Sequence, residues 1–318
     1  MNDPAMTDVD LSVELCPSRK SGLRLGNPVM VASGTFGYGT EYAALIDIQR
    51  LGAIVCKGVT LRPRVGNVQP RIAETPAGML NSIGLQNIGA RALVRDKAPV
   101  WKQWRVPVIV NIAGESYDEF QQLAAILEGV PGIAALEVNV SCPNVDQGGI
   151  EFGCDPLMAA QVTRVVRRES SLPVIVKLTP NAPDMCAVAR AVADAGADAL
   201  TVMNTILGMA IDVSKKTTVM QRGSAGLSGP AIKPIALYHV YRVAGAVDIP
   251  VIGCGGVSST SDALEFLMAG AAAVQVGTAN FVDPQTSIRI ITGLEDYLRK
   301  ERCASIAGVI GAARQPSS

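Results

Sequence analysis

The chain is poor in the residues that most often bind metals. It has one histidine, 4% aromatic residues, and seven cysteines at positions 16, 56, 142, 154, 186, 254 and 303 with no C-x-x-C pair. Zinc ribbons and iron–sulfur clusters need closely spaced cysteines, so the sequence predicts no metal site. Scattered cysteines of this kind instead indicate a reduced, cytoplasmic protein.

An excess of charge of one sign and long apolar runs are also missing. Lysine plus arginine and aspartate plus glutamate both total 28, which argues against binding to nucleic acid or an anionic membrane. No stretch reaches the roughly 18 apolar residues of a membrane span. The N-terminus, MNDPAMTDVDLSVELC, has acidic residues and no apolar signal segment. We therefore expect a soluble protein that holds any charged ligand locally.

What the chain does contain is an alternation of short β-branched runs with longer segments of helical period. This pattern is typical of βα units around a parallel sheet. The runs are PVMVAS (28–33), AIVCKG (53–58), VPVIVNIAG (106–114), IAALEVNVS (133–141), LPVIVKLTP (172–180), ADALTVMNT (197–205), IPVIGCGGV (249–257) and AAAVQVGTA (271–279).

Capping signals mark helices between these runs. Asp155 and Pro156 fit the N-cap and first position of one helix, and Asp184 opens another that Gly196 closes. Eight strands with eight helices predict an α/β fold, a single (β/α)8 TIM barrel formed by residues 1–318. Residues 1–10 and 310–318 are expected to be flexible, and an open doubly wound sheet is the alternative.

Three units carry inserted loops, after strands 2, 4 and 6. The two long insertions lie at about residues 59–92 and 206–230, and a shorter one follows strand 4. Long loops in a barrel usually form lids or binding loops above the carboxyl ends of the strands.

The carboxyl ends of the eight runs carry polar residues or glycine. In a barrel they converge on one mouth, although polar residues also collect wherever loops begin. Burying an unpaired ammonium group is costly, so two lysines inside apolar runs favour a functional site. The set is Ser33, Lys57, Asn111, Asn139 with Cys142, Lys177, Asn204, Thr205, Gly255, Gly256, Gly277 and Thr278.

Glycines after the last two strands point to a phosphate group. GCGGVSSTSDA and VGTANF place backbone N–H groups where they can cradle a phosphate without a basic side chain. The stretch SGTFGYGT (33–40) lacks the G-x-G-x-x-G order, so it predicts no dinucleotide site.

Cys142 is the candidate base. His239, the only histidine, lies in a helix of the outer ring, so acid–base chemistry falls to another residue type. A thiol with a pKa near 8.5 can serve, especially beside a cation or a backbone dipole. Cys142 directly follows the fourth strand, and Gly148 and Gly149 give its loop the flexibility of a lid. The alternative is a packed small residue, as we expect for Cys186 and Cys254.

Seven motifs resemble the dihydroorotate dehydrogenase family, flavin enzymes of pyrimidine synthesis. The resemblance runs from about residue 11 to 300. The motifs are ASGTFG (32–37), CKG (56–58), NSIGLQN (81–87), NVSCPN (139–144), GLSGPAIKP (226–234), IGCGGV (252–257) and VGTANF (276–281).

The resemblance implies one FMN at the mouth of the barrel and Cys142 as the base that oxidises dihydroorotate to orotate. The implied FMN contacts are Ser33, Lys57, Gly58, Asn111, Asn139, Lys177, Met203, Gly229, Gly255, Gly256, Gly277 and Thr278. The implied substrate contacts are Lys57, Asn81, Ser82, Ile83, Gly84, Leu85, Asn139, Asn204 and Thr205.

The cysteine in SCPN and the glutamine in NSIGLQN resemble the soluble, NAD-linked class with two kinds of subunit. This implies a homodimer within a heterotetramer, whose second subunit carries FAD and a [2Fe–2S] cluster. A fumarate-linked enzyme, a barrel similar to dihydropyrimidine dehydrogenase, a flavin-free barrel with a catalytic lysine, and a non-catalytic scaffold are the alternatives.

Overall fold

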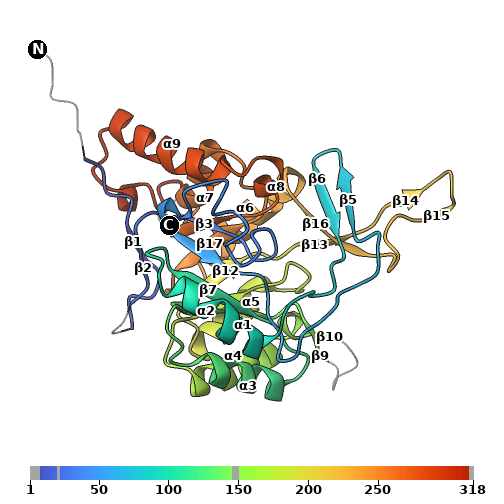
Figure 1. The fold of residues 1–318 in the computed structure, drawn as a ribbon. Coiled ribbons are helices and arrows are strands. Elements are labelled where there is room, and N and C mark those ends of the chain that lie inside the picture. The colour runs from blue at the N-terminus through green and yellow to red at the C-terminus, as the bar shows by residue number, and fades with distance from the viewer. Residues whose placement is uncertain (1–7, 20–21, 145–149, 315–318) are drawn as a thin grey trace, which may run out of the picture.

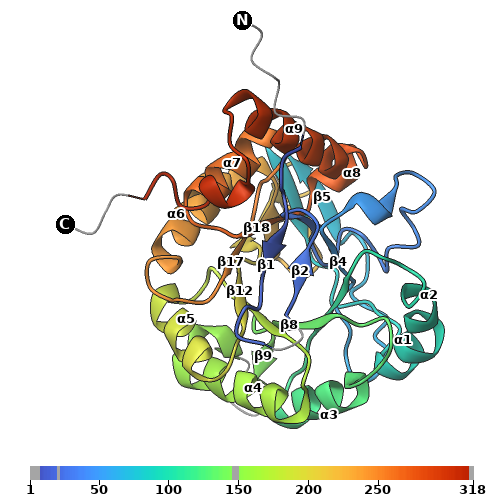
Figure 2. The same ribbon diagram turned by 90° about the vertical axis from the view of Figure 1, so that its left-hand side faces the viewer.

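A closed barrel of parallel strands forms the centre of the computed structural model, which describes residues 8–19, 22–144 and 150–314. Its strands are β3 (Val29–Val31), β4 (Ala53–Val55), β7 (Val108–Ile112), β8 (Ala135–Asn139), β11 (Val174–Lys177), β12 (Ala199–Val202), β17 (Val251–Cys254) and β18 (Ala273–Val276). They pair in the order β11-β12-β17-β18-β3-β4-β7-β8 (Figures 1 and 2). Each lies within one predicted run, so the predicted barrel is confirmed and the open sheet is wrong.

The barrel strands are buried on both faces. Helices cover the outside and side chains fill the inside, so the strands are nearly continuous apolar runs rather than alternating ones. Glu137, Thr201 and Gln275 are exceptions, because each is polar and fully buried within its strand.

The helices of the outer ring begin at the predicted caps. Asp155 accepts hydrogen bonds from the first turn of its helix, and Asp184 does the same, which confirms both predictions. The second of these helices ends at Asp194, and Gly196 follows with a φ of +101°. The helices are α1 (Ala90–Asp96), α2 (Ala98–Trp101), α3 (Tyr117–Leu127), α4 (Pro156–Glu169), α5 (Met185–Asp194), α6 (Lys233–Val243), α7 (Thr260–Met268), α8 (Ala279–Val282) and α9 (Thr286–Lys300).

The first βα unit differs from the prediction of one helix per strand. Residues 32–52, between β3 and β4, hold only the short 3-10 helix η1 (Ile48–Arg50). Gly34, Gly37 and Gly39 in this segment all have positive φ values, which an α-helix does not allow. The segment therefore turns repeatedly over the mouth instead of forming a helix.

The insertions after β4 and β12 combine into a second sheet. Strands β5 (Ile72–Thr75) and β6 (Gly78–Asn81) pair with β13 (Ile206–Gly208) and β16 (Ala225–Ser228) in the order β13-β16-β6-β5. This projecting sheet stands beyond the carboxyl ends of the barrel, at the right of Figure 1, with the hairpin β14 (Ile211–Asp212) and β15 (Thr217–Thr218) farther out. The third insertion forms the pair β9 (Pro143–Asn144) and β10 (Ile150–Glu151) and the 3-10 helix η3 (Phe152–Cys154).

A hairpin lies across the amino end of the barrel. Its strands, β1 (Val13–Glu14) and β2 (Arg24–Leu25), lie in front of the barrel in Figure 2. Asp198, just before β12, is 2.7 Å from Arg19 Nε of this hairpin and 2.9 Å from Arg167 Nη1 of α4. This ion-pair cluster ties the hairpin to the barrel.

The predicted flexible ends lie partly outside the described residues, at 1–7 and 315–318. Within the described part, Asp10 forms a bridge with Ser305 beside the 3-10 helix η5 (Ile306–Gly308). The Ala313 N–H donates to the Met268 carbonyl oxygen, so these described residues are held by hydrogen bonds. No helix in the described part of the chain is long and apolar enough to cross a membrane.

Candidate active site

A cavity of about 630 Å³ lies at the carboxyl ends of the barrel strands, beside the projecting sheet. Its lining draws on the ends of all eight strands and on the insertions, as expected for a barrel enzyme. The structure brings every predicted site residue to this cavity. These are Ser33, Lys57, Gly58, Asn81, Ser82, Ile83, Gly84, Leu85, Asn111, Asn139, Cys142, Lys177, Met203, Asn204, Thr205, Gly229, Gly255, Gly256, Gly277 and Thr278.

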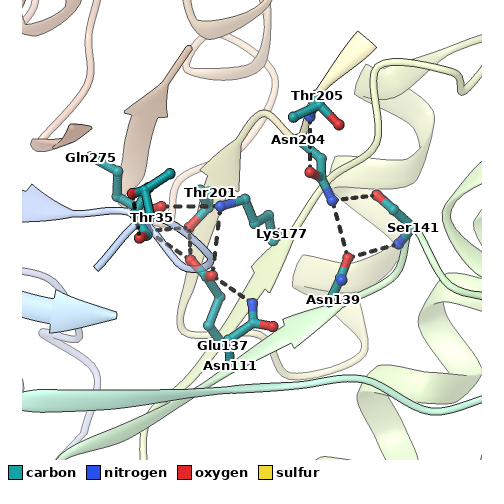
Figure 3. Close-up of polar contacts among 11 residues, drawn as sticks. Thr35, Asn111, Glu137, Asn139, Ser141, Lys177, Thr201, Asn204, Thr205 and Gln275 are labelled. Atoms are coloured by element: carbon teal, nitrogen blue, oxygen red, sulfur yellow. Dashed lines mark hydrogen bonds and ion pairs between the residues drawn. The ribbon is translucent and has the colours of Figure 1, made fainter. Parts of the chain in front are cut away.

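Lys177, at the end of β11, is held by a buried polar network beneath the cavity (Figure 3). Its Nζ donates to Gln275 Oε1 at 3.2 Å and lies 3.7 Å from Glu137 Oε1. Burial alone would lower the pKa of the Lys177 ammonium, but the neighbouring Cys254 and the Glu137 carboxylate raise it above its usual value. Lys177 therefore supplies a fixed positive charge at the cavity floor.

Amide and hydroxyl groups form a second cluster on the side of β8 and β12 (Figure 3). Asn204 Nδ2 donates to Asn139 Oδ1 at 3.2 Å and to Ser141 Oγ at 2.8 Å. Asn204 Oδ1 accepts from the Thr205 N–H at 2.8 Å. These bonds fix the orientation of the Asn204 amide, so the cavity meets ordered donors and acceptors.

Gly226 of the projecting sheet brings further polar groups to the same wall. Asn81 Nδ2 donates to the Gly226 carbonyl oxygen at 3.2 Å. A Cβ at Gly226 would lie 2.2 Å from Thr205 Oγ1, so only glycine permits this approach. Asn81 and Thr205, predicted as substrate contacts, are thus adjacent, although Asn81 belongs to the insertion after β4 and Thr205 to the segment after β12.

Lys57, which follows β4, carries the second ammonium group of the cavity. Among the described residues, no carboxylate lies within ion-pair distance of its Nζ. Burial, with a smaller contribution from Arg71, lowers the pKa of Lys57. Because a buried cation without a counterion is unfavourable, this arrangement favours an anionic ligand.

Cys142 lies just after β8 and is only 3% exposed. Burial raises the pKa of its thiol to about 12, against a hydrogen bond from the Gly114 backbone and the field of Arg64. A neighbouring cation, Arg64, is thus present, but burial outweighs its effect on the pKa. The predicted lid glycines, Gly148 and Gly149, lie outside the described residues.

Three charged residues near Cys142 were missed from the sequence. Arg64 Nη1 lies 2.8 Å from Glu115 Oε1, and Glu151 accepts from Thr179 Oγ1 at 2.7 Å. Arg64, Glu115 and Glu151 all line the cavity. Arg64 and Glu115 lie outside the helices and named strands and Glu151 lies in the two-residue strand β10, so no periodic pattern marked them.

Two buried residues were missed for other reasons. Glu137 is an acidic residue inside an apolar strand, the same signal that marked Lys57 and Lys177, and it could have been found in that way. Cys254 was predicted to be a packed cysteine. It is indeed buried, but it also lines the cavity beside Lys177.

The glycines of the last two units lie close to the projecting sheet. A Cβ at Gly256, whose φ is +79°, would lie 2.9 Å from the Gly229 carbonyl oxygen. Thr278 Oγ1 donates to Ser228 Oγ at 2.8 Å. These contacts bring the segments at 228–230, 255–258 and 277–279 to one side of the cavity. His239 is half-buried in α6 and is not part of this lining.

Comparisons with known proteins agree with the resemblance found in the motifs. The family model described as dihydroorotate dehydrogenase matches residues 17–298. A protein of Geotalea daltonii is 52% identical over 309 residues, covering 97% of this chain and 100% of that protein. A protein of Desulforamulus reducens is 56% identical over 287 residues, covering 90% of this chain and 94% of that protein. Both relatives are named dihydroorotate dehydrogenase B (NAD(+)), catalytic subunit.

Proposed function

Because the chain belongs to the dihydroorotate dehydrogenase family, we propose that it oxidises dihydroorotate to orotate with bound FMN, as the catalytic subunit of an NAD⁺-linked cytoplasmic enzyme of pyrimidine synthesis. The observation that carries the proposal is the composition of one cavity. It combines the Cys142 thiol, two ammonium groups, ordered amides and a wall of glycines. These are the groups needed to bind an anionic ring, remove a proton from it and hold a phosphate-bearing cofactor.

The cavity fits FMN. A Cβ at Gly277 would meet nothing closer than Ala32 Cβ at 3.6 Å, so protein packing does not require glycine there. Helix α8 begins after Thr278 without a side-chain cap, which suits binding of a phosphate by backbone N–H groups. We assign the phosphate to Gly255, Gly256, Gly277 and Thr278, and the ring to Ser33, Lys57, Gly58, Asn111, Asn139, Lys177, Met203 and Gly229.

The substrate position follows from charge and hydrogen bonding. Dihydroorotate is a carboxylate with polar ring edges. Lys57, a largely buried ammonium with no carboxylate within ion-pair distance among the described residues, suits its negative charge. The amides of Asn81, Asn139 and Asn204 suit the ring edges. We assign the substrate to Lys57, Asn81, Ser82, Ile83, Gly84, Leu85, Asn139, Asn204 and Thr205.

Cys142 removes the proton from the substrate ring, and FMN, when bound, accepts the hydride from the neighbouring carbon. The thiol has to lose its own proton before each turnover, because its raised pKa keeps it neutral near pH 7. Arg64 favours the thiolate, whereas Glu115 and Glu151 oppose it. Lys177 favours negative charge at the flavin ring.

We also propose a partner subunit that carries FAD and a [2Fe–2S] cluster, bound to a homodimer of this chain in a heterotetramer. The described residues hold no group of His, Cys, Asp or Glu suited to a metal. Leu207 of the projecting sheet is exposed and lines the cavity, and Met209, Ile211 and Val213, on or beside the β14–β15 hairpin, carry further exposed apolar side chains. A partner that covers them would exclude water from a large apolar surface.

Anaerobic titration tests the activity. The purified, yellow protein should lose its flavin absorbance on addition of dihydroorotate. Dihydrouracil should leave the absorbance unchanged. Bleaching by dihydrouracil alone, or a protein that does not bind FMN, would contradict the proposed function.

The partner is tested by the final electron acceptor. With the partner subunit present, dihydroorotate should reduce NAD⁺, and the double variant Ile211→Asp/Val213→Asp should lose this reaction while retaining flavin bleaching. Leu157→Asp, which replaces an exposed apolar side chain by a carboxylate on α4, is the control. Fumarate reduction by the isolated chain would contradict the assignment to the NAD⁺-linked class.

A further inference from the structure

Glu137 is a fully buried carboxylic acid beneath the cavity. Its side chain is fully buried in β8 and accepts three hydrogen bonds from side chains. Asn111 Nδ2 donates to Oε1 at 2.8 Å, and Thr201 Oγ1 and Gln275 Nε2 donate to Oε2 at 2.8 and 2.7 Å. With Lys177 at 3.7 Å, four other barrel strands place a polar side chain on this carboxylate, as Figure 3 shows.

The network has an upper and a lower layer. Asn111 and Lys177 line the cavity, whereas Glu137, Thr201 and Gln275 do not. Glu137 therefore does not touch a ligand in the cavity and can act only through the residues above it.

Glu137 sets the orientation of the Asn111 amide. Because Asn111 Nδ2 donates to the carboxylate, its Oδ1 is directed elsewhere, and a Cβ at Gly58 would lie 2.7 Å from that oxygen. Gly58 lines the cavity, so the side chain presents an acceptor there rather than a donor. A neutral amide in place of the Glu137 carboxylate could donate as well as accept, so it would no longer require the Asn111 NH₂ group to face it.

Glu137 also stabilises the charged form of Lys177. An ammonium group as buried as Lys177 is unfavourable without a counterion, and among the described residues the Glu137 carboxylate is the one carboxylate within ion-pair distance of it. Gln275 joins the two, accepting from Lys177 Nζ through Oε1 and donating to Glu137 through Nε2. Lys177 is thereby fixed in place as well as kept charged.

We infer that Glu137 is a positioning residue that fixes the Lys177 ammonium and the Asn111 carbonyl against the flavin ring and so sets the flavin's reduction potential. This inference depends on the proposed binding of FMN. It assigns no contact between Glu137 and the flavin or the substrate. Its effect passes through Lys177 and Asn111.

A double-mutant cycle tests the inference, with the midpoint potential of bound FMN as the readout. Glu137→Gln should shift the potential in the wild-type background and should shift it several-fold less in a Lys177→Met background, because the group it acts through is absent there. Thr201→Val, which removes one hydrogen bond to Glu137 but no charge, is the control and should leave the potential nearly unchanged.

A second cycle covers the case in which Glu137→Gln does not fold. Gln275→Leu keeps both charges and removes the bridge between them, together with the 3.3 Å hydrogen bond from Gln275 to Thr201. It should therefore shift the potential in the wild-type background and not in Lys177→Met. Equal shifts in both backgrounds, or none in the wild type, overturn the inference while FMN binding still supports the proposed function. Failure of the wild-type chain to bind FMN overturns both.

Discussion

The two ends of the barrel each carry a buried thiol, and burial raises the pKa of both Cys16 and Cys142 to about 12. Cys16 lies at the amino end, in the segment that joins β1 to β2, and is fully buried. Cys142 lies at the carboxyl end and lines a cavity of about 630 Å³. A perturbed pKa therefore does not identify a base by itself, and access to a ligand distinguishes the two thiols.

The two ends also differ in whether their charged side chains are paired with other protein groups. At the amino end, Asp198 pairs with both Arg19 and Arg167, so these charges serve the fold. At the carboxyl end, Lys57 has no such partner among the described residues. The charge that protein groups leave unsatisfied is the one available to a ligand.

Replacement of the two thiols should give the largest difference in activity between the two ends of the barrel. Cys142→Ala should lower dihydroorotate oxidation at pH 7 by about 10³-fold, the usual contribution of a general base, while FMN absorbance and orotate binding persist. Cys142→Ser should keep a small activity that increases at high pH. Cys16→Ala is the matched control and should leave turnover unchanged. Turnover that survives in Cys142→Ala would refute its role.

Removing the charge of Asp198 should lower the stability of the protein and leave its turnover unchanged, which is the opposite of the result expected for Cys142. Asp198→Asn should lower the free energy of unfolding by about 3 kcal/mol, because two arginines lose their shared carboxylate. Denaturant titration measures this loss, and turnover per folded molecule should not change. A fall in turnover without a fall in stability would show that the amino end takes part in catalysis.

The pH dependence should separate activity from stability. Activity needs the Cys142 thiolate, so the rate of flavin reduction should rise about tenfold per pH unit below the raised pKa. For Cys16, the folded pKa lies above the ordinary value of 9.0, so its stabilising effect is complete below pH 9 and is lost as pH rises towards 12. Cys16→Ala should reduce the fall in the free energy of unfolding above pH 9. A rate of flavin reduction that does not change from pH 6 to 9 would contradict the requirement for the Cys142 thiolate.

Gly277→Ala should have the smallest effect. The added methyl group meets no atom closer than 3.6 Å, so thermal unfolding of the FMN-free protein should not change. FMN affinity, measured by fluorescence quenching, should fall by about tenfold, or about 1.4 kcal/mol, if the methyl group enters the phosphate position. Unchanged affinity would show that the phosphate does not bind next to Gly277.

The barrel could be predicted from the sequence because each strand is a continuous apolar run that ends in a polar residue. The projecting sheet could not, because β6 and β16 come from insertions more than 140 residues apart and their pairing leaves no local pattern. The same reason applies within the site. Lys57 and Cys142 stand out in their own segments, whereas the pairing of Arg64 with Glu115 depends on two distant loops meeting.

The projecting sheet couples the lengths of the two long insertions, because strands from both pair within it. Leu80 pairs with Leu227 across the sheet, and Leu80 forms a small separate core with Met220 and Ala225. A one-residue change of length in either insertion would turn one strand over and expose this core. We therefore expect natural variants to change the lengths of residues 59–92 and 206–230 together, even though distant parts of the gene encode them.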